Sequence, residues 1–315
     1  MLPGMCMVSF FLCIYNMMYT VFLDQTTPRF EKFGLLALFS VGFGATYYLL
    51  HSKPEWILDS GSSLSDSVGK TLSALNDVLR EKKVFADLDL DVSKVLVPEH
   101  LTKTLVSVLA GHVSACVFPA ALRMAQMYQS VTSSTGVAYQ WGAKYLQSSE
   151  GVRLLWHATI AGPLLLIAST GMAKGGSKEM STGGALVVIA CHLVIIRPML
   201  QAFLNRGLIE WNDTKSSSNE AEVLDILAKY LKSALQRRLY VLGKVSVQSI
   251  TFPLLLISLL PLQAFSMLSG ASGKTRTPGQ GQFLWELVGS YLLWWACLTW
   301  SLVFIISLYT LRMYH

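Results

Sequence analysis

Three histidines lie in apolar stretches of the chain, where an imidazole could bind a metal or carry protons. His112, His157 and His192 each occupy a run without Asp, Glu, Lys or Arg. Histidines inside membrane helices can bind haem or transition metals, or relay protons. No second histidine or carboxylate accompanies any of them at helical spacing within its run, so a hydrogen bond to a neighbouring helix is the favoured interpretation. We therefore expect no metal, no cofactor and no catalytic residue.

A second group of chemically capable side chains combines arginine with amides. Arg197 interrupts an apolar stretch, and Gln201 and Asn205 follow one and two helical turns later. A guanidinium at the centre of a bilayer costs from about 2.5 kcal/mol upward, so it must reach water or pair inside the protein. Arginines and amides near the ends of other apolar runs fall at the same membrane boundary. The predicted polar cluster is Arg123, Gln126, Arg197, Gln201, Asn205 and Arg238.

Two interpretations of this cluster stay open. Arginines at a membrane boundary usually anchor helices by placing their charge among the lipid headgroups, and we favour that interpretation. Alternatively, the cluster forms a polar network that binds an anionic headgroup or holds a gate. Membrane lipid is the partner that these residues indicate, and no protein partner is indicated.

Motifs of known enzymes are incomplete in this sequence. Gly69-Lys70-Thr71 and Gly273-Lys274-Thr275 resemble the end of a phosphate-binding loop, but a leucine replaces the glycine that the motif requires five residues earlier. Asp87, Asp89 and Asp91 resemble half of a calcium loop, but Val92 stands where that loop needs glycine. We expect the chain not to be an enzyme.

The composition is that of a membrane protein. Of the 315 residues, 52% are hydrophobic and only 14% are charged, whereas soluble domains carry about 25% charged residues. A water-soluble enzyme, a disordered chain and a basic nucleic-acid-binding domain are therefore excluded, and no nucleic-acid partner is expected. The five cysteines all fall in apolar stretches, so none is placed to link loops by a disulfide.

Stretches of about 20 apolar residues can cross a bilayer core about 30 Å thick as helices. Only helices with internally paired backbone groups can do so in lipid, so these stretches predict an all-α, polytopic transmembrane helix bundle. The first stretch resembles a secretory signal in position, but it lacks a basic start and a small-residue cleavage site. The seven predicted spans cover residues 2–23, 34–50, 104–122, 154–173, 183–204, 245–268 and 287–311.

Polar segments divide the chain into three parts. Residues 1–51 hold the first two spans, residues 52–103 form a polar loop, and residues 104–315 form a five-helix membrane core. Within the loop, apolar residues from Leu64 to Leu79 recur at near-helical spacing and predict an amphipathic helix at the membrane interface. Residues 220–243 predict a second amphipathic helix, which a serine-rich loop precedes.

Basic residues indicate how the helices are oriented. The loops after the first, third and fifth spans, together with the C-terminus, carry the larger share of the 25 Lys and Arg residues. Cytosolic loops of membrane proteins are enriched in these residues. We therefore expect the 220–243 helix and the C-terminus to lie in the cytosol, in a membrane that the sequence does not identify.

Several short stretches follow one another in the order and spacing of a known family. FPAALRMAQM (118–127) and RPMLQAFLN (197–205) are followed by Arg238, Phe252-Pro253-Leu254 and Trp294-Trp295-Ala296. Over residues 104–314 this set resembles the transmembrane protein 161 family, while the first half matches in hydropathy only. Family members usually begin with a further hydrophobic segment and a basic region, so the chain resembles an N-terminally short or divergent member. The family-like structural positions are Phe118, Pro119, Pro253, Trp294 and Trp295.

The resemblance implies a membrane protein without a known reaction, substrate or cofactor. Family members in animals are linked to cardiac rhythm, neural development and protection from oxidative stress, which implies an influence on membrane ion handling. Our first hypothesis is therefore a non-enzymatic regulator or structural component in membrane ion homeostasis. The alternative is an ion channel or transporter, because prolines such as Pro119 and Pro253 free backbone carbonyls that can line a pathway. A haem or metal oxidoreductase that uses the three histidines is the remote alternative.

Overall fold

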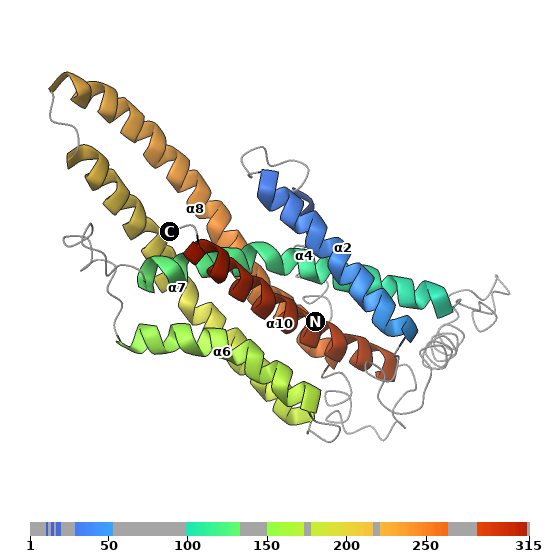
Figure 1. Cartoon of the computed structure of the whole chain (residues 1–315). Helices are drawn as coiled ribbons and strands as arrows, with labels where there is room; N and C mark the ends of the chain where they lie inside the picture. Colours follow the sequence, from blue (N-terminus) through green and yellow to red (C-terminus); the bar gives the residue numbers. More distant parts are fainter. Residues whose placement is uncertain are drawn as a thin grey trace, which may run out of the picture.

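Long helices make up the part of the chain that the structure describes. The computed structural model describes residues 29–52, 99–132, 150–172, 178–216, 221–263 and 282–313, with a few residues between Phe11 and Tyr19. Each range is one helix, as Figure 1 shows. The helices are α2 (Arg29–Ser52), α4 (Glu99–Thr132), α6 (Glu150–Met172), α7 (Lys178–Ser216), α8 (Ala221–Gln263) and α10 (Gln282–Met313).

Within the described residues, six helices are long and apolar enough to cross a membrane. Their apolar segments are 19 to 27 residues long, and at 1.5 Å per residue even the shortest covers about 28 Å. The chain is therefore an all-α, multi-pass integral membrane protein. The spans are Arg29–Ser52, Lys103–Gln129, Glu150–Ala168, Thr182–Asn205, Leu242–Gln263 and Val288–Met313.

The six spans match the last six of the seven predicted ones, with two informative shifts. The second predicted span begins at Arg29 rather than residue 34, and the third continues to Gln129 rather than ending at residue 122. Both extensions carry charged or amide side chains into a helix that the charge-free criterion had cut short. Most of the first predicted span and the amphipathic helix predicted between residues 64 and 79 lie outside the described residues.

The amphipathic helix predicted over 220–243 is not a separate element. Helix α8 runs without a break from Ala221 to Gln263, so this segment continues directly into the membrane span. The predicted boundary at Gly243 fails because one glycine inside a helix costs only about 1 kcal/mol, which a long helix tolerates. Helix α7 likewise continues to Ser216, beyond the predicted end of its span at residue 204.

Helix α4 is the centre of the bundle. It packs against α2, α7, α8 and α10, while α6 contacts α7 and α10 at the periphery. Figure 1 shows α2 lying along α4 on one side and α6 on the opposite side of the molecule. Trp156, Phe252 and Trp300 are among the largest fully buried side chains, so aromatic rings fill the core between the helices.

The outward faces of the helices are apolar. Phe33 on α2, Val187 on α7 and Ile306 on α10 are all more than half exposed. A soluble protein would not present so much exposed apolar surface, whereas lipid is a suitable solvent for it.

Helices α2 and α4 approach unusually closely because glycines face the contact. A Cβ atom added at Gly42 would overlap the hydroxyl of Ser114 and would lie 3.1 Å from the carbonyl oxygen of Ala110. A Cβ atom added at Gly111 would lie 2.9 Å from the carbonyl oxygen of Phe39. Small residues that admit such close contact are a common basis of helix association in membranes.

Candidate functional site

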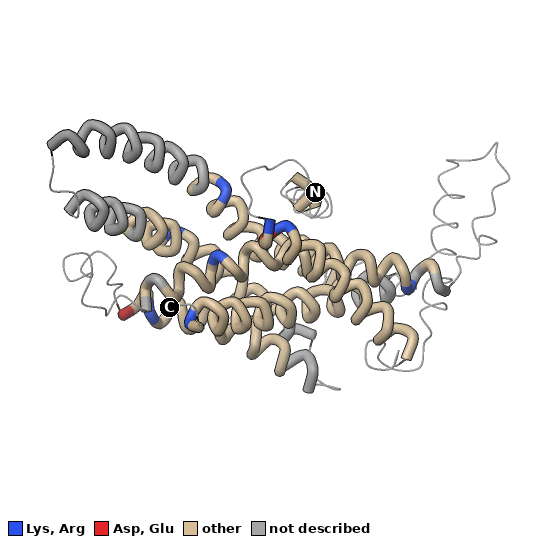
Figure 2. Tube along the Cα trace, turned by 45° about the horizontal axis from the view of Figure 1, so that its top comes forward, with Lys and Arg blue, Asp and Glu red and all other residues tan. Residues whose placement is uncertain are grey.

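Basic side chains gather at one end of the bundle. This end, which we call the basic end, is where the spans of α2, α6 and α8 begin and those of α4, α7 and α10 end. In Figure 2 most of the blue Lys and Arg segments lie in the half of the bundle where α7 ends and α8 begins. Within the six spans, Lys103 belongs to the opposite end. The basic end holds Arg29, Lys32, Arg123, Arg153, Arg197, Lys244 and Arg312.

Contacts between helices place these ends together. The Nε2 atom of Gln129 near the end of α4 donates to the carbonyl oxygen of Leu311 at the end of α10, at 3.2 Å. The ring of Tyr128 lies 5.9 Å from that of Trp156, near the start of α6. Each pair joins two helices at the basic end, as the alternation of consecutive spans requires.

Arg123 is the centre of a buried polar network at this end. Its Nη2 atom donates to Oε1 of Glu31 at 2.6 Å, and its Nε atom donates to Oε1 of Gln248 at 3.0 Å. Its Nη1 atom donates to Oε1 of Gln126, one turn further along α4, at 2.9 Å. We call Glu31, Arg123, Gln126 and Gln248 the Arg123 network; it joins α2, α4 and α8.

The network is electrically neutral and shielded from solvent. The side chains of Arg123 and Glu31 are only 14% and 5% exposed. Opposite charges that are buried together compensate one another, whereas removing either partner leaves an unpaired charge in a region of low dielectric constant. The Nε2 atom of Gln248 is buried and makes no hydrogen bond to any described group. One donor at the edge of the network is therefore unused.

The structure brings together only part of the predicted polar cluster. Arg123 and Gln126 belong to the Arg123 network. Gln201 and Asn205 instead form a pair within α7, with Nε2 of Gln201 donating to Oδ1 of Asn205 at 2.8 Å. Arg197, one turn before Gln201, is exposed on α7. The side chain of Arg238, the remaining member, lies outside the described residues.

Sequence reasoning missed Glu31 and Gln248. A search for charge-free stretches starts the second span after Lys32, so it leaves Glu31 in the preceding loop. A usable signal existed, because the buried face of α2 contains Glu31, Leu35, Gly42, Thr46 and Leu50 at helical spacing. A carboxylate on that face needs a cationic partner in the bundle. Gln248 lies inside the predicted span 245–268, where an uncharged side chain does not stand out.

The family-like structural positions lie in the packed interior of the bundle. Pro119 and Pro253 are buried within α4 and α8, and the ring of half-buried Phe118 contacts Gly34 of α2. Trp295 is buried, and its Nε1 atom donates to the hydroxyl of Ser114 at 2.8 Å. The ring of the adjacent Trp294 lies 6.2 Å from that of Trp295.

A second polar contact lies between α2 and α10. The hydroxyl groups of Thr46 and Tyr291 are 2.9 Å apart and buried. The hydroxyl pair of Thr46 and Tyr291 connects α10 to α2, and the hydrogen bond from Trp295 to Ser114 connects α10 to α4. Interhelical hydrogen bonds of this kind contribute about 0.6 kcal/mol on average in a membrane.

The three histidines do not form a shared site. His112 lies on α4 with its ring 5.0 Å from that of Phe39, and His157 is exposed on α6. His192 is buried on α7 between the rings of Phe252 and Trp300, at 4.7 and 5.0 Å. Among the described residues, no group of three or more His, Cys, Asp and Glu side chains could hold a metal ion.

Comparison with known proteins adds no relative. No protein-family model, no curated protein and no solved structure matches the chain.

Proposed function

We propose that the chain is a non-enzymatic membrane protein of the transmembrane protein 161 type, a regulator or structural component in membrane ion homeostasis. The link to ion homeostasis rests on the family resemblance. The observation that carries the structural role is the buried Arg123 network, which we interpret as a latch that holds α2 against α4 and α8.

The geometry of Arg123 supports a latch rather than a binding site. Each of its three nitrogen atoms already donates to a protein oxygen, of Glu31, Gln126 or Gln248. An anionic ligand would compete with the carboxylate of Glu31, which already neutralises the guanidinium at 2.6 Å. A neutral network that joins three helices instead fixes their relative position.

Exchange of the two charges tests the latch. Glu31→Gln and Arg123→Gln should each weaken the attachment of α2, because each leaves one buried charge unpaired. The double variant Glu31→Arg/Arg123→Glu should restore most of the attachment, since Gln248 can turn its free Nε2 atom toward the new carboxylate. Cross-linking between cysteines at Gly34 and Phe118 would report the attachment. If the single variants cross-link as well as the parent, the network is not a latch.

We place the basic end, and with it the C-terminus, in the cytosol. This orientation is supported by the distribution of Lys and Arg residues within the six spans. Among these residues, only Lys103 lies at the other end. Cytosolic loops near span ends are enriched in Lys and Arg. A tag after His315 should become accessible to impermeant reagents when the plasma membrane alone is permeabilised. Labelling of intact cells, or labelling only after internal membranes are also opened, would contradict this orientation.

Anionic lipid headgroups are the partner that we propose for the outer face of α7. Arg197 is exposed there, one turn from the Gln201–Asn205 pair, at the basic end. An exposed guanidinium at that depth can reach phosphate, whereas Arg123 is occupied. Native mass spectrometry of the parent and of Arg197→Gln should show fewer retained anionic lipids in the variant. Arg153→Gln is the matched control, because it removes an exposed basic residue from α6 instead of α7.

An ion channel or transporter is the second candidate. One observation favours it: Glu31 is a buried carboxylate within a span, and such groups often mark ion or proton pathways. Purified protein in liposomes should then conduct an ion, and Glu31→Gln should abolish the flux. The absence of flux across a broad ion panel would remove this candidate and leave the regulator.

A further inference from the structure

One exposed arginine lies far inside its membrane span. Arg197 stands eight positions before Asn205, where the span of α7 ends at the basic end, so it lies about 12 Å inside the span. The other exposed basic residues of the described spans are Arg29, Arg153 and Arg312, each within three positions of a span end. Arg197 is therefore the deepest exposed charge in the described part of the bundle.

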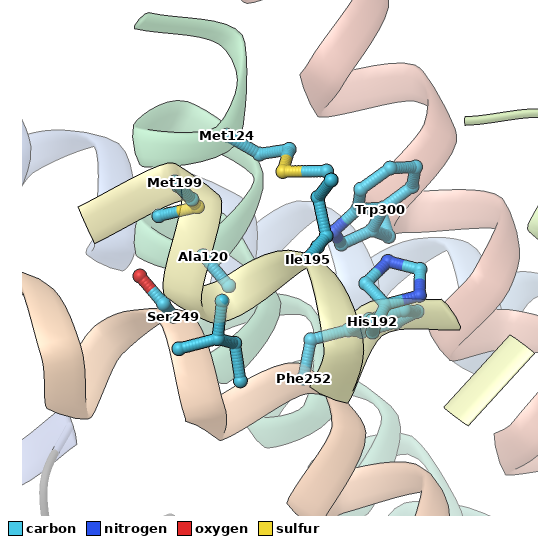
Figure 3. Close-up of a pocket in the computed structure, with 9 residues that line it drawn as sticks. Ala120, Met124, His192, Ile195, Met199, Ser249, Phe252 and Trp300 are labelled. Carbon is cyan, nitrogen blue, oxygen red and sulfur yellow. The ribbon is translucent and has the colours of Figure 1, made fainter. Parts of the chain in front are cut away.

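Arg197 faces lipid rather than another helix. It continues the outer face of α7, on which Leu193 and Val194 are exposed one turn earlier. Figure 3 shows the opposite face of α7, where His192 and Met199 border a small internal cavity against α4, α8 and α10. No described side chain pairs with the guanidinium of Arg197, so this charge needs water or an anion from outside the bundle.

The direction of α7 holds Arg197 away from water. In a helix the Cα–Cβ bonds tilt toward the N-terminus, which for α7 lies at the end opposite the basic end. The stem of Arg197 therefore leaves the backbone toward the middle of the bilayer. Arg153 has the opposite situation, because α6 begins at the basic end and the same tilt directs its stem toward the boundary.

Too little helix precedes Arg197 to cross a bilayer of ordinary thickness. Thr182, where the span begins, and Arg197 are 15 positions apart, which gives about 22 Å along the helix axis, and tilt only shortens the distance across the membrane. The hydrocarbon core of a bilayer is about 30 Å thick. A guanidinium at headgroup level on α7 thus requires a bilayer that is thinner beside this helix than elsewhere.

Polar side chains connect Arg197 with the membrane boundary. Gln201 and Asn205 follow one and two turns later, and the Nε2 atom of Gln201 donates to Oδ1 of Asn205 at 2.8 Å. We call Arg197, Gln201 and Asn205 the α7 strip. A headgroup that moves inward along the strip meets hydrogen-bonding groups instead of apolar side chains alone.

We propose that the α7 strip draws the phosphate of an anionic phospholipid below the ordinary headgroup level, so that the leaflet at the basic end is thinned beside α7. The inference rests on the proposed lipid partner of Arg197 and adds the depth at which that lipid is bound. Guanidinium and phosphate form strong, charge-assisted hydrogen bonds, which offset the cost of deforming the leaflet. The site therefore selects phospholipids with short chains, because their chains fit the thinned leaflet.

Competition between two chain lengths tests the depth of the phosphate. The purified full-length chain is placed in nanodiscs that contain equal amounts of dimyristoleoyl and dioleoyl phosphatidylglycerol, which differ only in chain length. Native mass spectrometry should show the shorter lipid retained at least about threefold more than the longer one. Arg197→Leu should retain less of both lipids.

Moving the arginine separates the depth from the binding itself. The double variant Arg197→Leu/Gln201→Arg shifts the guanidinium by one turn, about 6 Å, toward the boundary. It should still retain phosphatidylglycerol but lose the preference for short chains. Equal retention of both chain lengths by the parent would overturn the thinned leaflet and leave the lipid partner intact, whereas retention of neither would remove both.

Water accessibility beside α7 gives a second measurement, which does not depend on lipid affinity. Val194→Cys on α7 and Leu302→Cys on α10 each carry a nitroxide in a chain whose native cysteines are replaced by alanine. Both positions are exposed, and both lie 11 positions before the end of their spans at the basic end. A water-soluble nickel chelate should relax the nitroxide at residue 194 at least about threefold more than that at residue 302, and Arg197→Leu should remove the difference.

Two results of these measurements would overturn the proposal. Equal relaxation at the two nitroxides, in protein that retains the lipid, would mean that the headgroup stays at its ordinary level. Displacement of the lipid by inorganic phosphate would identify a site for the free anion, which needs no deformation of the leaflet.

Discussion

Helices α4 and α7 each carry an arginine followed by glutamine at helical spacing, yet the two pairs lie in opposite environments. On α4, Arg123 is mostly buried and donates both to Gln126 and to groups on two other helices. On α7, Arg197 is exposed and Gln201 bonds to Asn205 of the same helix. The same residue types therefore serve as an internal connection in one helix and as a surface feature in the other.

The difference comes from partners on other helices. Glu31 of α2 supplies the opposite charge that compensates the buried guanidinium of Arg123, and Gln248 of α8 supplies a further acceptor. A buried guanidinium needs such partners, whereas one at the membrane boundary can be hydrated or can contact headgroups. The environment of an intramembrane arginine is thus decided by residues distant in sequence.

Loss of the charge of Arg123 should produce the largest effect. Arg123→Leu should lower the free energy of unfolding by about 3–5 kcal/mol, because it leaves the carboxylate of Glu31 buried without a partner. Unfolding of the detergent-solubilised protein by a denaturing detergent measures this value. A loss below about 1 kcal/mol would contradict the contrast with Arg197, because exposed ion pairs contribute no more than that to the free energy of unfolding.

The close contact between α2 and α4 should be the next most sensitive feature. Gly42→Ala should destabilise the protein by about 1–3 kcal/mol, because the added methyl group overlaps Ser114 and pushes α2 away from the Arg123 network. Gly44→Ala is the control, because a Cβ atom at Gly44 meets nothing within 4 Å. The same unfolding assay should show the control to be as stable as the parent or more so, and equal losses in both would contradict the packing argument.

Removal of a neutral interhelical hydrogen bond should have a smaller effect. Tyr291→Phe deletes the hydroxyl that lies 2.9 Å from that of Thr46 while keeping the ring. We expect a loss of about 0.6 kcal/mol and at most about 1.7 kcal/mol in the unfolding assay. A larger loss would mean that uncharged contacts hold α2 as firmly as the charged network does.

Substitution of Arg197 should have the smallest effect on stability. Arg197→Leu removes an exposed side chain, so the free energy of unfolding should change by less than about 0.5 kcal/mol. The retained anionic lipid should decrease in the same variant, as measured by native mass spectrometry. Destabilisation comparable to that of Arg123→Leu would show that the two arginines are equivalent after all.

The positions of the membrane spans could be predicted because they depend on local composition. A run of about 20 apolar residues must become a helix in lipid whatever surrounds it. The ends of the runs were less predictable, since the span of α4 continues past Arg123 to Gln129 and the span of α2 begins before Glu31. Those extensions are stable because the charges compensate one another across helices, which a single run of sequence does not reveal.

The candidate site could be predicted only in part for the same reason. Arg123 and Gln126 stood out as polar residues beside an apolar run, but their partners Glu31 and Gln248 are 92 and 125 residues from Arg123. The residue pattern within one helix identifies candidate site residues, and the contacts between helices decide what those residues do.

The unbroken course of α8 has a mechanical consequence. At 1.5 Å per residue, its 43 residues extend about 64 Å, roughly twice the thickness of a bilayer core. Gln248 lies on this rod a short distance inside the span, where it touches Arg123. A force on the part of α8 outside the span would therefore be transmitted along a stiff helix. It would reach the helices around Arg123 through Gln248.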